Sequence, residues 1–287
     1  MESRWQTPVA VPDLAQSIDY RQSKILFLGS CFAAEMGQRM GQLGFSALVN
    51  PFGVLYNPAS IAGALQRLSS AKPFVREELV CSQGRYASFE HQYLFGQPTP
   101  EAFLEQANTA LAQSAFFLSE ATHVVLSLGT SWVYRHLARQ QIVANCHKLP
   151  EKEFKRLFLS SQESLGLLSP WMAAFPQIQW VLTVSPIRHL KDGAHGNQLS
   201  KAALLLAIEA LCKRFPSAYY FPAYELVLDE LRDYRYYAAD MVHIQSAAVD
   251  YIWERFMAAA ITPSSREDVA EAARRLKREG HQEKMGH

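Results

Sequence analysis

The sequence lacks both an excess of charge and a long apolar run. Its 28 basic and 27 acidic residues leave a formal net charge of +1, which gives no electrostatic basis for binding nucleic acid or an anionic membrane. No window approaches the roughly 18 consecutive apolar residues of a membrane-spanning helix. Residues 1–19 contain no basic stretch followed by the apolar core of a signal peptide. We therefore expect a cytoplasmic protein with neither nucleic-acid nor membrane partners.

Cysteine is also scarce, with four residues scattered along the chain. Cys31, Cys81, Cys146 and Cys212 form no CxxC pair, so neither a disulfide framework nor a resident metal is expected. Cys81 and Cys212 lie in apolar runs, which favours packing in the core over chemistry. Cys31 follows Gly-Ser, and Cys146 lies in Asn-Cys-His-Lys. The reactivity of these two thiols depends on their surroundings.

What the sequence does contain is a succession of short apolar runs that alternate with amphipathic segments. The runs end at turn or helix signals, which is typical of buried strands. These runs are 24–28, 45–49, 123–128, 179–184 and 218–221. Apolar residues recur at helical spacing over 33–43, 100–118, 151–165 and 199–211. The alternation predicts an α/β fold, in which helices cover both faces of a mostly parallel central sheet in a three-layer α/β/α sandwich.

No repeat, low-complexity linker or convincing boundary divides the chain. We expect a single domain over residues 1–262, with a small inserted β element around 79–95 and 132–147. The signals for this insertion are the short runs 85–89 and 141–145, which are typical of a hairpin or of edge strands.

The C-terminal segment has a different composition. Residues 263–287 are rich in Arg, Glu and Lys. We expect them to form a solvated helix that frays into a polar tail from Gly280 onward.

Polar and glycine residues follow the predicted strands, at the edge where open parallel sheets bind their ligands. They gather in four stretches: 29–31, 50–53, 129–132 and 185–189. In the first stretch, Cys31 follows a glycine turn and opens a predicted helix, whose N–H groups and dipole stabilise a thiolate or an oxyanion. A packed turn with a buried, inert cysteine would have the same local sequence. Both interpretations stay open at this point.

Two further elements can complete such a site. Gly53 lies in a loop after the second strand, where a glycine N–H can donate to a developing oxyanion or the glycine can simply permit a turn. Asp240 precedes His243 by three residues, a spacing that lets the carboxylate orient the imidazole for general-base duty. The same spacing occurs in surface caps, so by itself it does not establish catalysis.

In their order and spacing these elements resemble the SGNH/GDSL hydrolase superfamily. That superfamily has a G-D-S nucleophile block, an oxyanion glycine, a G-x-N-D block and a late D-x-x-H block. Residues 29–33, which read GSCFA, are similar to the motif of the GSCFA family, the closer match. Further similarity lies in 128–134, 145–148 and 185–189, and the resemblance runs from about residue 24 to about residue 256. It implies a flavodoxin-like sandwich of the SGNH hydrolase type.

Two positions depart from the superfamily pattern. Cys31 stands in place of the nucleophilic serine, and Ser30 in place of the aspartate. Register and thiol reactivity favour Cys31 as the nucleophile, whereas Ser30 would serve if the turn were shifted by one residue. Ser131 replaces the Asn of the G-x-N-D block, so an oxyanion donor worth roughly 3–4 kcal/mol in the transition state is unassigned. Thr130, Ser131 or the Asn145 side chain would have to supply it.

The resemblance implies acyl transfer as the activity. His243, oriented by Asp240, would take the proton of Cys31 for attack on an acyl ester or thioester, and the N–H groups of Cys31 and Gly53 would hold the oxyanion. An esterase or deacylase and an O-acyltransferase both fit this chemistry, with a small molecule or a saccharide as the substrate. No cofactor is expected, although an acyl-coenzyme A would act as the co-substrate of a transferase.

Other residues near the predicted strand ends are candidates for binding the substrate. Arg188 and His189 follow a strand and Ser-Pro, and a guanidinium suits a carboxylate or a phosphate. His147 is a third candidate, because it lies in a stretch that resembles the family. Lys201 begins a helix and is expected to be solvated or capping, and His91 is assigned to a lid on the insertion. The aromatic residues expected in the core are Trp132, Tyr134 and Trp180.

Two other classes of function remain open. One is a metal site, although the spacings match no known structural zinc pattern. Its N and S ligands would come from Cys31, Cys146, His147, His189 and His243. The other is a non-catalytic protein that binds carbohydrate or acyl groups on an SGNH scaffold, which the missing Asn favours. It predicts stabilisation by ligand without turnover of nitrophenyl acetate or an acetyl thioester.

Overall fold

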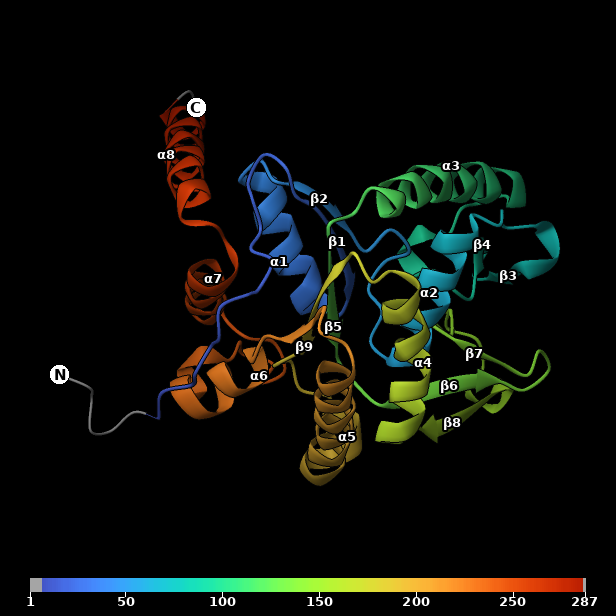
Figure 1. Cartoon of the computed structure of the whole chain (residues 1–287). Helices are drawn as coiled ribbons and strands as arrows, with labels where there is room; N and C mark the ends of the chain where they lie inside the picture. The colour runs from blue at the N-terminus through green and yellow to red at the C-terminus, as the bar shows by residue number, and fades with distance from the viewer. Residues whose placement is uncertain (1–6, 286–287) are drawn as a thin grey trace.

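The computed structural model describes residues 7–285, and within them five parallel strands form a central sheet with helices on both faces (Figure 1). The strands are β1 (Lys24–Gly29), β2 (Ser46–Val49), β5 (His123–Leu128), β9 (Gln179–Val184) and β10 (Ala218–Tyr220). Their order, β2-β1-β5-β9-β10, is the flavodoxin-like order of doubly wound folds, whose winding reverses between β1 and β5. The predicted three-layer α/β/α sandwich is confirmed.

Alternate side chains of each strand enter two separate cores. In β1, Leu26 and Leu28 pack on one face, and Ile25 and Phe27 pack on the other. The first face is covered by α2 (Pro58–Ser70), α3 (Pro100–Ser119), α4 (Ser161–Ala174) and α5 (Gly193–Arg214). The second face is covered by α1 (Cys31–Gln42), the short α6 (Ala223–Glu225) and α7 (Ser246–Ala260). Because both faces are buried, the central strands are continuous apolar runs in the sequence.

Capping residues mark where several helices begin. The Asn57 side chain accepts the Ser60 N–H at 2.8 Å and is followed by Pro58, so α2 begins at this point. Thr99 and Pro100 begin α3 in the same way. The helix α2 was not predicted from the sequence, although Asn-Pro is a local signal for its start.

Two small antiparallel sheets lie to one side of the sandwich (Figure 1). They are formed by β3 (Leu79–Ser82) with β4 (Arg85–Ser88), and by β6 (Trp132–His136) between β7 (Gln141–Val143) and β8 (Phe154–Phe158). The strand signals at 85–89 and 141–145 correspond to β4 and β7. The helix predicted over 151–165 is wrong in its first half, because antiparallel pairing with β6 makes 154–158 a strand. The helix α4 begins only after the capping box of Ser160 and Glu163.

The C-terminal helix α8 (Pro263–Met285) extends away from the sandwich (Figure 1). Its first turns are anchored, because Val269 and Ala272 are buried in the same core as α1 and α7. The backbone stays helical from Gly280 to Met285, where a fraying tail was predicted, and residues 286–287 of that tail lie outside the described residues. None of the helices within residues 7–285 is both long and apolar enough to cross a membrane.

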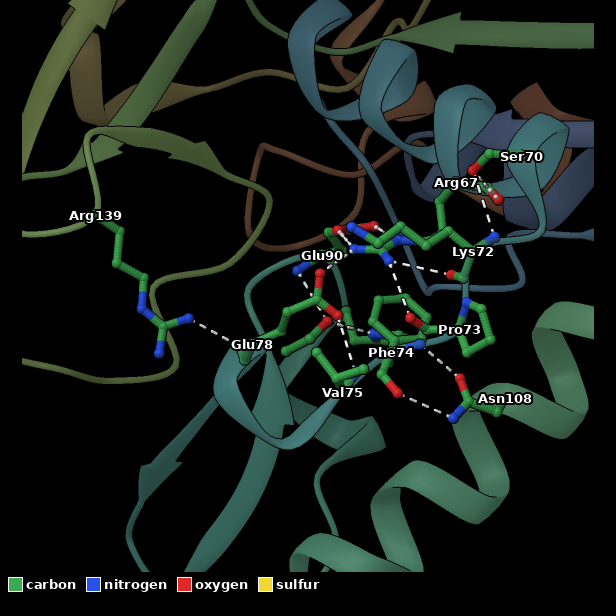
Figure 2. Close-up of polar contacts among 12 residues, drawn as sticks. Arg67, Ser70, Lys72, Pro73, Phe74, Val75, Glu78, Glu90, Asn108 and Arg139 are labelled. Atoms are coloured by element: carbon green, nitrogen blue, oxygen red, sulfur yellow. Dashed lines mark hydrogen bonds and ion pairs between the residues drawn. The ribbon is translucent and has the colours of Figure 1, made fainter.

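A buried arginine ties the β3–β4 hairpin to α2 (Figure 2). Arg67 is 9% exposed and binds two carboxylates, with Nη2 2.8 Å from Glu78 and Nε 3.1 Å from Glu90. Its Nη1 donates to the Lys72 carbonyl at 3.1 Å, and the guanidinium lies 4.3 Å from the centre of the Phe74 ring. A buried guanidinium is tolerated only when its donors are satisfied in this way.

Arg67→Met is expected to destabilise the fold by about 2–4 kcal/mol, because it leaves Glu78 and Glu90 together without a counter-ion. For a chain of this size that corresponds to a fall in Tm of about 3–7 °C, measurable by calorimetry. Arg76→Met is the matched control, since it breaks only the exposed pair with Glu101 and should shift Tm by less than about 2 °C. Equal shifts in the two variants would show that the Arg67 cluster does not anchor the hairpin.

Candidate active site

A cavity of about 510 Å³ lies beyond the carboxyl ends of β1, β5 and β9. Here the winding of the sheet reverses, the place where doubly wound folds bind their ligands. The loops that follow these strands line it, with Cys31 after β1, Thr130 after β5 and His189 after β9. Residues of β6 and β8 line it as well. Three of the four polar stretches singled out in the sequence therefore converge on one cavity, whereas residues 50–53 are not part of its lining.

The turn between β1 and α1 separates the two predicted nucleophiles. Ser30 is 1% exposed, and its Oγ lies 2.9 Å from the Ser127 Oγ. Cys31 is half-buried, begins α1 and lines the cavity, with its Sγ 3.7 Å from the Tyr56 hydroxyl. A thiol at this position adjoins N–H groups of the first helical turn, which have no acceptor within a helix. Of the two candidates, Cys31 is the one that a ligand in the cavity can reach.

The Asp240–His243 pair lies in the loop before α7, and its histidine lines the same cavity. Asp240 Oδ1 accepts the N–H groups of Val242 and His243 at 2.9 and 3.0 Å, and its Oδ2 lies 2.7 Å from His243 Nδ1. The His243 side chain and then these backbone N–H groups lower the pKa of Asp240 to about 2. The carboxylate therefore stays ionised and holds the imidazole through Nδ1. The residue His243 lines the cavity, and its Nε2 atom is left for another partner.

Two of the predicted oxyanion donors are already engaged elsewhere. The N–H of Gly53 donates to the Asn50 carbonyl at 2.8 Å, so this glycine, with φ of +87°, serves a turn. Ser131 is fully buried, its N–H donates to the Ser200 hydroxyl at 2.7 Å, and its own hydroxyl donates to the Ser200 carbonyl at 2.9 Å. Neither residue offers a free donor to a ligand in the cavity.

The other two predicted donors, Thr130 and Asn145, line the cavity. The Thr130 N–H donates to the Tyr56 carbonyl at 2.8 Å, and the Thr130 hydroxyl accepts the Trp132 N–H at 3.1 Å. Asn145 Oδ1 accepts the His147 N–H at 2.8 Å, which orients the amide and leaves its Nδ2 group as a donor. Asn145 is therefore the better candidate for the donor that the sequence motif lacks.

Two of the predicted substrate-binding residues, Arg188 and His189, line the cavity, whereas the third is buried elsewhere. His147 is 2% exposed, with its Nε2 2.8 Å from the Ser88 carbonyl, so the prediction that it contacts substrate has no support in this position. Burial, and next the charge of Lys201, lower the pKa of His189 to about 4. His189 is therefore neutral at pH 7.

Lys201, predicted to be solvated or capping, is instead 1% exposed. Its Nζ donates to the carbonyls of Gly129 and Ser185, both at 2.7 Å, and these residues directly follow β5 and β9. Burial first, and then the charge of Arg188, lower the pKa of Lys201 to about 7. Lys201 thus joins the two strand ends that carry one side of the cavity. The missed signal is its spacing of three residues from Leu204 on the buried side of α5.

The sequence analysis also missed the wall that β6 and β8 supply. Trp132 and Tyr134 were expected in the core, but alternate along β6 and line the cavity. Arg156 of β8 lies opposite Tyr134 in register, 4.1 Å from the centre of the Trp132 ring, and forms an ion pair with Asp192. The third aromatic expected in the core, Trp180, is fully buried as predicted.

Tyr56 is a further residue that sequence reasoning missed. Burial, and then the adjacent Cys31 thiol, raise the pKa of Tyr56, so its hydroxyl remains a hydrogen-bond donor beside the sulfur. The only signal in the sequence was its place in the loop after the second strand, three residues beyond Gly53.

The remaining cysteines differ from Cys31 in their surroundings. Cys146 lines the cavity, but burial raises its pKa to about 11, which keeps it a protonated and weakly nucleophilic thiol at neutral pH. Cys212 packs half-buried against the core, as predicted. The prediction that Cys81 is a core residue is wrong, because it lies exposed on the two-stranded β3–β4 sheet.

His91, assigned to a lid by the sequence analysis, is instead 1% exposed inside an aromatic cluster. Its ring centre lies 5.1 Å from that of Phe52 and 5.1 Å from that of Phe103. The Nδ1 atom lies 2.8 Å from the Ser88 hydroxyl. Burial lowers the pKa of this histidine to about 3, so it is a neutral core residue.

The buried histidines predict a loss of stability in acid. The folded pKa values of His91 and His189, about 3 and about 4, lie below the unfolded value of 6.5. Between pH 6.5 and these values only the unfolded chain takes up the protons, so the free energy of unfolding falls as the pH drops. Each histidine contributes up to roughly 1.4 kcal/mol per pH unit, and its contribution is complete above pH 6.5. Urea unfolding at a series of pH values measures this slope. His91→Gln should reduce it by one histidine's share, and an unchanged slope would contradict this origin.

Comparison with known families bears on the origin of this arrangement. A model described as the GSCFA family matches residues 24–256. The chain belongs to the GSCFA family. In this GSCFA protein the matched range includes all five strands of the central sheet and the Asp240–His243 loop, whereas α8 lies beyond it. A comparison with curated proteins found no match. Over the described part of this GSCFA chain, no three His, Cys, Asp or Glu side chains are grouped as a metal site requires.

Proposed function

We propose that this GSCFA protein catalyses acyl transfer from an ester or a thioester, with Cys31 as the nucleophile. The observation that carries the proposal is that Cys31 and His243, from opposite ends of the matched range, line one cavity where the sheet reverses its winding. A nucleophile, a base and a carboxylate that orients the base are the components that covalent acyl transfer requires.

In the proposed reaction, His243 accepts the proton of the Cys31 thiol, and the thiolate attacks the acyl carbonyl carbon. The oxyanion of the tetrahedral intermediate is held by the N–H groups at the start of α1, with the Asn145 amide or the Tyr56 hydroxyl as a second donor. The intermediate collapses to an acyl-thioester on Cys31, and His243 returns its proton to the departing alcohol or thiol. Water or an acceptor hydroxyl then takes the acyl group, and Cys31 is regenerated.

The same chemistry favours assigning this protein to the SGNH type of hydrolase. Cys31 would then stand in place of the nucleophilic serine of that superfamily. A thiol suits exchange with an acyl thioester. We therefore propose two alternative activities, a transferase that uses acyl-coenzyme A as its co-substrate and an esterase or deacylase. No resident cofactor is required by this route. A free thiol nucleophile needs a reducing compartment, which accords with the cytoplasmic location expected from the sequence.

A second candidate function is a non-catalytic carbohydrate- or acyl-group-binding protein. The observation that favours it is that the Gly53 and Ser131 donors are committed to other partners, which weakens the oxyanion site by comparison with the superfamily pattern. Without such donors the cavity would bind an acyl compound and release it unchanged.

Incubation with an acetyl thioester and with nitrophenyl acetate, followed by rapid acid quench and intact-mass analysis, separates the two functions. Acyl transfer predicts a mass increase of one acyl group, which peptide mapping assigns to Cys31, together with release of the thiol or nitrophenol. Thermal stabilisation by both compounds, with neither an acyl adduct nor product, would instead establish the binding protein and refute catalysis.

A further inference from the structure

A second cavity, of about 310 Å³, adjoins the candidate active site. Its walls come from the π-helical segment Leu226–Leu231, from the turn that follows it and from the Asp240–His243 loop. Val227, Leu228 and Met241 supply apolar surface, and Tyr234 and Tyr237 supply two ring faces and two hydroxyls. π-Helical turns occur often at functional sites, because they widen the backbone locally and re-aim side chains.

Arg188 lines both cavities and so joins them. Its backbone N–H donates to the Val242 carbonyl at 3.1 Å, which fixes it against the loop that carries the base. Met241 of that loop lines the second cavity, whereas Val242 and His243 line the first. The Asp240–His243 loop therefore contributes to the lining of both cavities, as Arg188 does.

Two arginines line the second cavity, and one of them carries a buried donor atom that lacks a partner. Arg188 Nη1 is buried and has no hydrogen-bond partner among the described residues. Arg232 is exposed and lines the cavity as well. The acidic residue of the lining, Asp233, is already bound by the Arg235 side chain at 3.1 Å and by its N–H at 2.7 Å. A buried guanidinium donor left unpaired costs free energy unless a ligand satisfies it.

We infer that the second cavity binds an oxyanion, a carboxylate or a phosphate, through the guanidinium groups of Arg188 and Arg232. A planar guanidinium group can donate two parallel N–H hydrogen bonds to either anion. The hydroxyls of Tyr234 and Tyr237 offer two further hydrogen-bond donors. The apolar wall accommodates the carbon skeleton that carries the anion. The further statement that this anion belongs to the acyl substrate rests on the proposed function. It narrows the substrate class to acyl compounds with an anionic group.

Calorimetric titration at low ionic strength tests the binding directly, with malonate as the carboxylate probe and pyrophosphate as the phosphate probe. The wild-type protein should bind at least one probe saturably, and the tighter probe identifies the anion class. Arg232→Met changes an exposed residue and should weaken binding at least about tenfold. Arg188→Lys should also weaken binding, because an ammonium group lacks the paired N–H donors of a guanidinium group. Arg76→Met is the matched control and should bind as the wild type does. No saturable binding of either probe, or equal affinity in Arg232→Met, would overturn the inference.

Kinetics then separate this inference from the proposed function. If both hold, kcat/KM for a malonyl or phosphate-bearing thioester exceeds that for a neutral acetyl thioester at least about tenfold, and Arg232→Met removes the difference. Arginine-dependent anion binding without turnover of any thioester would refute acyl transfer and leave the anion site standing. Turnover with equal kcat/KM for anionic and neutral thioesters would refute the anionic substrate.

Discussion

Replacing Cys31 with alanine is expected to lower kcat/KM for an acyl thioester by at least about 10³-fold, because no other group would form the covalent intermediate. The thiol lies in the cavity, 3.7 Å from the Tyr56 hydroxyl and at the first position of α1. His243→Ala should reduce the rate by about 10²–10⁴-fold through loss of the base. Steady-state assays of thiol release measure both effects.

The controls for this prediction are Cys146, a second thiol of the same cavity, and Ser30, the alternative nucleophile next to Cys31 in the sequence. Cys146→Ala removes a thiol from the same cavity, but one whose pKa is about 11, and should leave kcat/KM within about threefold of wild type. Ser30→Ala removes a buried hydroxyl that is bound to Ser127, so it should lower stability modestly and preserve the chemistry. Loss of turnover in Ser30→Ala at unchanged fold, with turnover kept in Cys31→Ala, would transfer the nucleophile's role to the serine.

Gly29→Ala is expected to destabilise the fold by about 3–5 kcal/mol or to prevent folding, since it combines a steric clash with an unfavourable backbone angle. Gly29 ends β1 with φ of +143°, and an added Cβ would lie 2.2 Å from the Ser127 carbonyl oxygen. That oxygen belongs to β5, which is paired on both sides, so it has no room to retreat. Chemical denaturation monitored by circular dichroism measures the loss.

Gly63→Ala is the matched control for this substitution. Gly63 lies inside α2, and an added Cβ there would meet nothing within 4 Å. Alanine has the higher helix propensity, so a gain of up to about 1 kcal/mol is expected. A similar loss of stability in both variants would mean that the close approach of β1 to β5 is not the reason for a glycine at position 29. The first glycine of the family motif would then need another explanation.

The accuracy of the sequence-based prediction varied with the kind of burial. The strands 123–128 and 179–184 were predicted with the bounds that the structure has, because both faces of a central parallel strand are buried and most of its residues are apolar. The strand Phe154–Phe158 was missed, because only one partner strand decides its conformation and its residues also fit helical spacing. Lys201 was misjudged for a related reason, since its burial depends on two carbonyls that arrive from other strands.

The residues of the candidate site also differ in whether the sequence could predict them. Cys31, Asp240 and His243 were predicted from the sequence, because the spacing of their short motifs is visible in the chain, and two of them line the cavity. Tyr56, Arg156 and the unpaired Arg188 Nη1 could be recognised only after folding, since their neighbours are far away in sequence.

The sequence by itself determined the α/β sandwich, the order of its central strands along the chain and the residue types available for chemistry at their carboxyl ends. Those features follow from apolar periodicity and from turn residues, which act over a few positions. Only the tertiary structure decided that Cys31 and Cys146 line one cavity, which N–H donors are already bound and where two arginines border a second cavity. Hydrogen-bond partners and burial depend on contacts between distant segments, which periodicity along one chain does not encode.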